Sequence, residues 1–332
     1  MAEPLLEVRN LTVRFPIWGG VLRHKVAEVR AVDDVSLTLY KGETLGLVGE
    51  SGCGKTTAAK AICNILKDTA PGVIEQGEIL FHGKGEPVNL LELSRGDMRP
   101  YRQLIQMIFQ DPFSSLNPRM TVREIIERPL IVHTDMTADA RRNRVHELLE
   151  KVGLQAAYDT RYPHEFSGGQ RQRIGIARSL AARPQLIIAD EPVSALDVSV
   201  QSQVINLLQD LQDEFDLTFL FVAHDLSVVY HISDRIAVMY LGNMVEIGDA
   251  ETVYRQPQHP YSQALLSAVP QPNPSKTRED RIKLKGEIPS PLNKPKGCGF
   301  HPRCPLAIDA CSKDVPQLAE KESGQLAACP VT

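Results

Sequence analysis

One short segment constrains the fold of this chain more than any other. The apolar residues 45–48 lead directly into a glycine-rich run that fits the pattern G-x-x-x-x-G-K-[ST], and residues 57–66 then show helical periodicity. In such a strand–loop–helix unit, glycines let backbone N–H groups turn toward phosphates at the positive end of the helix. A chance glycine turn is the alternative, and the flanking strand and helix disfavour it. The residues expected at the phosphate site are Gly49, Glu50, Ser51, Gly52, Cys53, Gly54, Lys55, Thr56 and Thr57.

Two side chains of this loop have specific expected roles. Lys55 is expected to reach the β- and γ-phosphates of a nucleoside triphosphate, and the Thr56 hydroxyl to bind Mg²⁺.

The length of 332 residues suggests about two domains, and 42% hydrophobic residues suffice for a buried core. The net charge of -4 argues against a nucleic-acid-binding protein, which usually needs a basic surface.

Membrane anchors and export signals are not evident in the sequence. Glu3, Glu7 and Arg9 interrupt the first apolar stretch, and the later apolar runs, such as residues 217–223, are far shorter than the ~20 residues of a membrane span. We therefore expect a cytoplasmic chain unless a partner holds it at a membrane.

The N-terminal region predicts an antiparallel flank. Residues 5–15 and 30–39 are strand candidates, and the second alternates apolar with polar side chains. The residues between them, which include Pro16 and two glycines, are interpreted as an exposed loop or a long hairpin connection. Phe15 ends the first strand, where it is either an ordinary core residue or an aromatic platform for a nucleobase; spacing alone favours the core. Farther on, residues 138–152 predict a helix that stops at Gly153.

Polar side chains follow three further strand candidates. Gln110 follows residues 105–109, Asp190 and Glu191 follow the apolar residues 186–189, and His224 follows residues 218–222. Functional groups in α/β folds gather at the carboxyl ends of the parallel strands. One of the two acids can serve Mg²⁺ while the other acts as a base for water. Surface acids are common and a lone histidine is usually structural, so the positions at strand ends carry the argument.

A second glycine-rich turn predicts another helix N-terminus that faces phosphate. Residues 174–180 have the spacing of an amphipathic helix, and a polar turn stands directly before it. The turn consists of Ser167, Gly168, Gly169 and Gln170.

These motifs together resemble the ATPase subunits of ABC transporters. The resemblance rests on GESGCGKT at Gly49, FQDP around Gln110, SGGQ at Ser167, LIIADEP, SALD and VAHD, in the order typical of that family. It implies an α/β fold with a RecA-like P-loop domain over residues 1–257, an antiparallel β subdomain and an inserted helical subdomain at about residues 91–166. It also implies a head-to-tail dimer in which each ATP lies between the P-loop of one subunit and the SGGQ of the other.

The same resemblance assigns roles to individual residues. Lys55 and Thr56 hold phosphate and Mg²⁺, Asp190 supports the metal, and Glu191 is the general base. His224 contacts the γ-phosphate, and Gln110 touches the metal and links the site to membrane subunits. Phe15 stands where that family has its adenine-stacking aromatic, and Asp197 organises the dimer interface.

The last quarter narrows the resemblance to oligopeptide and dipeptide permease ATPases, and most closely to the F-type oligopeptide subunit. QHPY at Gln258, GEIPSP at Gly286 and a cysteine-rich tail carry it, together with RYPHEFSGGQ and SLNPRM. It implies a C-terminal extension over residues 258–332. It further implies a subunit peripheral to the cytoplasmic face of the inner membrane that drives peptide uptake through two integral membrane permease subunits. A second ABC ATPase subunit, more often a different chain than a copy, and a substrate-binding protein complete the implied assembly.

Other functions stay open at this point. Similar ATPases import nickel or glutathione. A soluble ABC ATPase of DNA repair or translation usually has a long coiled coil or two cores, whereas this chain has one core and no sustained heptads. A metal-sensing regulator has only the cysteine tail in its favour.

The tail contains Cys298, Cys304, Cys311 and Cys329. Unrelated or disulfide-bonded thiols are the simplest interpretation, and a reducing cytoplasm disfavours disulfides. Structural zinc and a 4Fe-4S cluster both accept four thiolates. Zinc sites usually contain a close C-x₂₋₄-C pair, which this tail lacks, and Cys304 and Cys329 each precede proline, as one ligand does in bacterial ferredoxins. Some of the resembling ATPases carry a cluster here, so a 4Fe-4S cluster is predicted, with zinc as the alternative.

Overall fold

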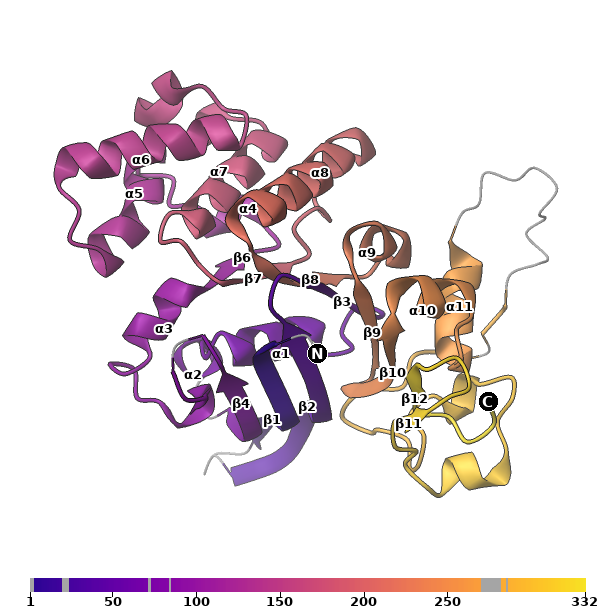
Figure 1. Cartoon of the computed structure of the whole chain (residues 1–332). Coiled ribbons are helices and arrows are strands. Elements are labelled where there is room, and N and C mark those ends of the chain that lie inside the picture. The colour runs from indigo at the N-terminus through magenta and orange to yellow at the C-terminus, as the bar shows by residue number, and fades with distance from the viewer. Residues whose placement is uncertain (1–2, 20–23, 71–72, 84, 270–281, 285) are drawn as a thin grey trace.

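The described part of the chain forms a four-stranded and an eight-stranded β-sheet with helices packed around them (Figure 1). The structure is a computed structural model that describes residues 3–19, 24–70, 73–83, 85–269, 282–284 and 286–332. Within these residues no helix combines the length and the apolar character needed to cross a membrane.

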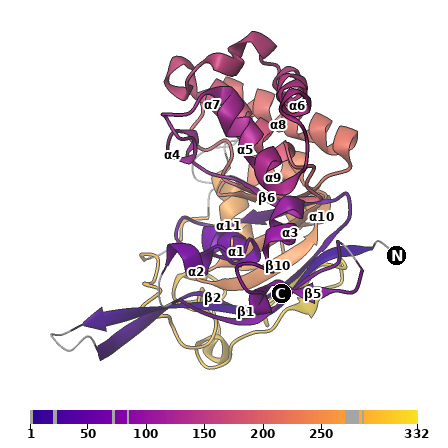
Figure 2. The same cartoon turned by 90° about the vertical axis from the view of Figure 1, so that its left-hand side faces the viewer.

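The smaller sheet is antiparallel and has the order β2-β1-β4-β5. Its strands are β1 (Pro4–Gly19), β2 (His24–Tyr40), β4 (Ile74–Phe81) and β5 (Val88–Asn89). It confirms the antiparallel flank, and of the two expected connections, an exposed loop or a long hairpin, the structure has the hairpin, with β1 and β2 paired as far as Gly19 and His24. Proline is tolerated there because β4 pairs with β1 only as far as Arg14, so Pro16 lies in a two-stranded part at the edge of the sheet. Figure 2 shows the resulting hairpin as a long arm that projects from the body.

The larger sheet holds the nucleotide motifs and has the order β11-β12-β10-β9-β3-β8-β7-β6. Five strands are parallel: β6 (Ile105–Ile108), β7 (Leu186–Asp190), β8 (Thr218–Ala223), β3 (Thr44–Val48) and β9 (Arg235–Tyr240). Three antiparallel strands extend one edge: β10 (Asn243–Asp249), β12 (Leu326–Ala327) and β11 (Ala319–Glu320). The parallel order brings the carboxyl ends of β3, β7 and β8 together, so the three motifs that follow them meet at one edge.

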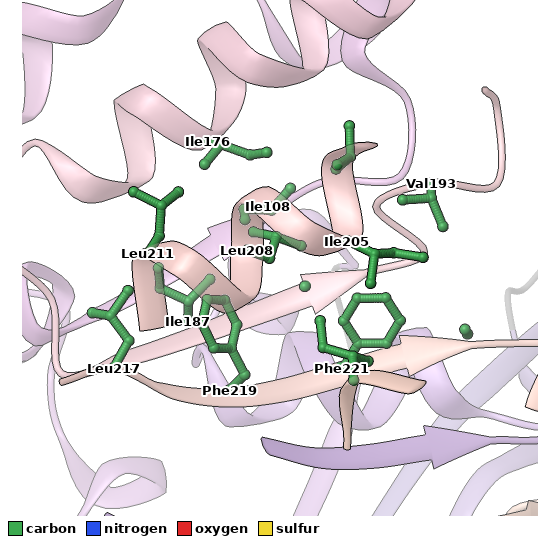
Figure 3. Close-up of a cluster of buried hydrophobic side chains, with 14 of the residues drawn as sticks. Ile108, Ile176, Ile187, Val193, Ile205, Leu208, Leu211, Leu217, Phe219 and Phe221 are labelled. Carbon is green, nitrogen blue, oxygen red and sulfur yellow. The ribbon is translucent and has the colours of Figure 1, made fainter. Parts of the chain in front are cut away.

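Both faces of the parallel strands are buried, which explains their continuous apolar sequences. Ile187, Phe219 and Phe221 point toward α8 (Val198–Phe215), where Leu208 and Leu211 meet them (Figure 3). The alternate residues of the same strands, among them Leu220 and Val222, belong to the opposite core, which includes the buried face of α1 (Lys55–Ile62). The strands are therefore held between α8 on one face and, on the other, α1 together with the antiparallel sheet.

Two of the remaining helices follow signals predicted from the sequence. Helix α6 (Ala138–Lys151) ends just before Gly153, which has a φ of 72° and was expected to stop it, and α7 (Gly168–Leu180) begins at the second glycine-rich turn. A capping box formed by Thr121 and Glu124 starts α5 (Val122–His133). Helices α5, α6 and α7 pack together beside the larger sheet (Figure 1). The remaining helices are α2 (Leu66–Thr69), α3 (Arg99–Leu104), α4 (Pro112–Ser115), α5 (Val122–His133), α6 (Ala138–Lys151), α7 (Gly168–Leu180), α9 (Leu226–Ile232), α10 (Ala250–Arg255) and α11 (Pro260–Ala268), with 3-10 turns η1 (Leu90–Glu92), η2 (Ala156–Thr160), η3 (Pro163–Glu165), η5 (His301–Arg303) and η6 (Asp309–Ser312).

The C-terminal residues join the core rather than standing apart from it. Strand β12 pairs with β10 and so extends the larger sheet. The buried carboxylate of Glu246 accepts hydrogen bonds from the backbone N–H groups of Gln258 and His259 and from the Gln325 amide, at 2.6, 3.0 and 2.8 Å. Residues from both ends of the extension therefore share one buried acceptor in the core.

His259 makes the extension sensitive to acid. The side chain caps α11 by accepting the Tyr261 N–H at Nδ1, and burial lowers the pKa of His259 to about 4. In the unfolded chain the pKa is about 6.5, so the unfolded state binds more protons below that value and stability falls as pH drops from 6.5 toward 4. We expect the native chain to lose about 3 kcal/mol more unfolding free energy over this range than His259→Asn, which keeps a capping side chain without titrating. Urea denaturation at several pH values measures the two slopes, and equal slopes would contradict the assignment.

Candidate functional site

The glycine-rich loop connects β3 to α1, as predicted, and wraps around the Lys55 side chain. The Lys55 ammonium donates to the carbonyl oxygens of Gly49 and Glu50 at 2.7 and 3.0 Å. Gly54 has a φ of 108°, and a Cβ there would lie 2.0 Å from the Ala31 carbonyl oxygen. A side chain at Gly49 would meet the Met239 carbonyl oxygen at 2.2 Å. Close backbone packing therefore requires glycine at positions 49 and 54, and the positive φ of Gly54 favours it there as well.

A cavity of about 360 Å³ lies in front of this loop. Loop and α1 residues line one side, and the side chains predicted at the strand ends line another. Sequence reasoning missed one lining residue, Ala31, because a small apolar residue in β2 gives no chemical signal. The lining residues are Ala31, Ser51, Gly52, Gly54, Lys55, Thr56, Thr57, Gln110, Glu191 and His224.

Two acidic residues contact lining residues of the cavity: Asp190 meets Thr56, and Glu191 meets Gln110. The Thr56 hydroxyl donates to Asp190 Oδ1 at 2.8 Å, and burial raises the pKa of that carboxyl group. A hydroxyl beside a carboxylate offers two oxygen ligands of the kind that Mg²⁺ prefers, so these residues fit the metal. Glu191 accepts the Gln110 amide at 2.9 Å, and His224 Nδ1 lies 3.5 Å from the same carboxylate oxygen.

Glu191 has a backbone conformation that is unusual for a residue other than glycine. Its φ is 45°, in the left-handed region, and its N–H donates to the Val222 carbonyl of the neighbouring strand at 2.8 Å. Such conformations are uncommon outside glycine and persist where the surroundings impose them. The turn places Glu191 over the cavity while the preceding Asp190 stays buried. The sequence had placed both acids at the strand end without this turn.

The Ser167–Gln170 turn caps α7, away from the lining of this cavity. The Ser167 hydroxyl accepts the Gln170 N–H at 3.3 Å, and the Gln170 side chain accepts the Ser167 N–H at 3.0 Å. This reciprocal pair is a capping box. A Cβ at Gly169 would lie 2.5 Å from Val200 in α8, and Asp197 caps that same helix by accepting the Val200 N–H at 3.1 Å. The turn and the start of α8 therefore form one rigid surface.

Phe15 and Cys53 are not among the residues that line the cavity. Phe15 is half-buried on β1 and packs against the core beneath the loop. Cys53 is buried within the loop itself. Sequence reasoning also missed two residues of the extension, Tyr261 and Arg303, which both contact Glu50. They lie more than two hundred positions away, and nothing local links them to the loop.

The four tail cysteines are all free thiols. Cys311 and Cys329 are buried, whereas Cys298 and Cys304 are half-buried. The Cys298 N–H donates to the Cys311 carbonyl at 2.8 Å, which joins the two segments. Among the residues that the structure describes, no three His, Cys, Asp or Glu side chains are grouped as ligands around one point. The metal assignment therefore stays a prediction.

The fold and the loop define an ATP-binding cassette, and comparison with known proteins places the chain more narrowly. Residues 32–194 match the ABC transporter family. Among solved structures, the dimeric post-hydrolysis state of the ATP-binding cassette MJ0796 bound to ADP and Pi matches with a TM-score of 0.62 and 28% identity, over 74% of this chain and 99% of that one.

Residues 245–311 match the oligopeptide/dipeptide transporter C-terminal region. The oligopeptide transport ATP-binding protein AppF of Bacillus subtilis is 53% identical over 98% of this chain and 97% of its own length. The oligopeptide transport ATP-binding protein OppF of Escherichia coli is 52% identical over 95% and 92%. The chain belongs to the ABC transporter ATP-binding proteins of the oligopeptide/dipeptide transport family.

Proposed function

We propose that this chain is the ATP-hydrolysing subunit of a membrane ABC importer and energises the uptake of oligopeptides or dipeptides. Its similarity to AppF and OppF over nearly the whole chain, extension included, is the observation that carries the proposal. Nickel or glutathione is the alternative cargo. A soluble ABC ATPase of repair or translation is disfavoured, because the family match extends into the transporter-type C-terminal region.

The reaction is phosphoryl transfer from ATP to water, in which positioning and electrostatics supply most of the catalysis. Lys55 and the loop N–H groups bind the phosphates, and Thr56 and Asp190 would hold Mg²⁺, with Gln110 beside them as a further ligand. When bound, Mg²⁺ neutralises charge that develops on the phosphate oxygens. Glu191 accepts a proton from the attacking water, and the contact of Gln110 and His224 with its carboxylate supports this role. His224 approaches the γ-phosphate, and Phe15 stacks on the adenine.

The Ser167–Gln170 turn acts on the ATP of a second subunit in a head-to-tail dimer. Its position outside the cavity supports this, because within one chain the turn does not line the site. Asp197 braces that surface. The second subunit is a different ABC ATPase, and two integral membrane permease subunits provide the transport path at the cytoplasmic face of the inner membrane. A substrate-binding protein acts through them, and nucleic acid has no part.

Reconstitution of the membrane complex tests the proposal. Recovery of the chain with integral membrane proteins, and ATP turnover stimulated by a peptide-loaded binding protein, are the expected results. Stimulation by nickel or glutathione instead of peptides would change the cargo. Recovery with ribosomes or DNA would refute the transporter.

We also propose that Cys298, Cys304, Cys311 and Cys329 hold a 4Fe-4S cluster that acts structurally or as a redox brake, with zinc as the alternative. The support for this proposal is that all four thiols are free and partly or fully buried, and that a backbone hydrogen bond of 2.8 Å joins Cys298 to Cys311. Protein purified without oxygen should be brown, absorb near ~400 nm and contain about four irons per chain. Colourless protein with one zinc would overturn the cluster, and colourless protein without metal would leave ordinary thiols.

A further inference from the structure

The second residue of the phosphate loop, Glu50, is held from outside the cassette. Its backbone N–H donates to the Tyr261 hydroxyl at 2.8 Å, and its carboxylate accepts both terminal nitrogens of Arg303, at 2.9 and 3.3 Å. Tyr261 and Arg303 belong to the C-terminal extension, in α11 and η5. The extension therefore forms hydrogen bonds with both the backbone and the side chain of Glu50.

The Arg303 guanidinium is fixed in place by packing. Its side chain is only 9% exposed, and one terminal nitrogen also donates to the Tyr240 hydroxyl at 3.4 Å. Tyr240, Tyr261 and Phe300 form an aromatic cluster beneath it, with ring centroids 4.6 to 5.4 Å apart. A bidentate arginine–carboxylate pair with little solvent around it is stronger than an exposed ion pair.

The ion pair between Arg303 and Glu50 changes the net charge of the phosphate loop. A loop that cradles phosphates works through positive potential, and a carboxylate within it opposes the binding of a polyanion. Lys55 is the cation within the loop, and its ammonium donates to the carbonyl oxygens of Gly49 and Glu50 rather than to the Glu50 carboxylate. Within the described residues, Arg303 is the cation that forms an ion pair with the Glu50 carboxylate.

We propose that Arg303 is a positioning residue for ATP binding: it neutralises Glu50 and holds the loop in its phosphate-binding shape, so that the extension sets the affinity of the site. This inference rests on the proposed ATPase function and adds a residue of the extension to it. Arg303 acts through Glu50 and the loop.

Affinity for MgATP in the purified full-length chain tests the proposal. Arg303→Met keeps the length and apolar packing of the side chain but removes its charge, so the dissociation constant should rise about tenfold at low salt. The deficit should shrink as sodium chloride is added, because salt screens the repulsion between Glu50 and the phosphates. Arg255→Ala is the matched control: it removes an exposed arginine that pairs with Glu251 on α10, and its affinity should equal that of the native chain.

A double variant, Glu50→Gln in the Arg303→Met background, separates the effect of charge from a purely structural effect of Arg303 on the loop. If the Glu50 carboxylate weakens binding once it is unpaired, Glu50→Gln in the Arg303→Met background should recover most of the lost affinity, and Arg303→Lys should lose less than Arg303→Met. An Arg303→Met chain that binds MgATP as tightly as the native chain would overturn the inference, as would a loss that neither Glu50→Gln nor salt relieves. Failure of the native chain to bind ATP would instead overturn the proposed function itself.

Discussion

Glu191→Gln should lower ATP turnover by about 10²-fold or more while ATP still binds. The glutamine keeps the size of the side chain and can retain the 2.9 Å contact with Gln110, but it cannot accept a proton from water. The left-handed backbone at this residue should be unaffected, because both side chains begin with the same atoms. Mixed with the second ATPase subunit, the variant should therefore accumulate as an ATP-bound dimer, which size-exclusion chromatography with MgATP detects.

Turnover and binding must be measured on the same preparation. Glu214→Gln makes the same chemical change at a half-exposed site on α8, where the carboxylate pairs with Lys151, and should hydrolyse ATP at the native rate. Hydrolysis at the native rate by Glu191→Gln would show that the base lies elsewhere.

Lys55→Ala should fail at an earlier step, with ATP affinity reduced about tenfold or more. Lys55 is buried, and its ammonium lies against two loop carbonyls from which it can turn to the phosphates. Alanine removes the charge and also leaves those carbonyls without their donor. Equilibrium binding of a fluorescent ATP analogue measures the change.

Lys151→Ala supplies the comparison for this variant. It removes an exposed lysine that pairs with Glu214, far along the chain from the loop. Its affinity for ATP should match that of the native chain. An unchanged affinity in Lys55→Ala as well would mean that the loop does not bind phosphate in the way its sequence indicates.

Sequence pattern was sufficient wherever the relevant interactions are local. The start of the helix at Ser167, the stop at Gly153 and the buried strand before Asp190 all depend on neighbours within a few residues. The gathering of Gln110, Glu191 and His224 at one cavity could also be predicted. Parallel strands bring their carboxyl ends together regardless of the loops that connect them.

Long-range pairing explains what the sequence did not reveal. The sequence left a loop and a long hairpin open after Pro16, and pairing with β2 decides for the hairpin. Residues 326–327 form the short strand β12 because β10 offers an edge for pairing. The contacts of Glu50 with Tyr261 and Arg303 join positions that no window of sequence contains together. The left-handed turn at Glu191 likewise depends on the Val222 carbonyl of another strand.

The pairing of β12 with β10 makes the C-terminal extension part of the same folding unit as the larger sheet. Strand β12 covers β10, and Gln325 completes the buried Glu246 site, so the last residues of the chain finish a core whose first strands form near its start. Residues 326–327 must therefore leave the ribosome before β12 can pair with Glu246 and Ile247 of β10. Until then β10 remains an open edge that other chains can pair with, which exposes the nascent protein to aggregation during its synthesis.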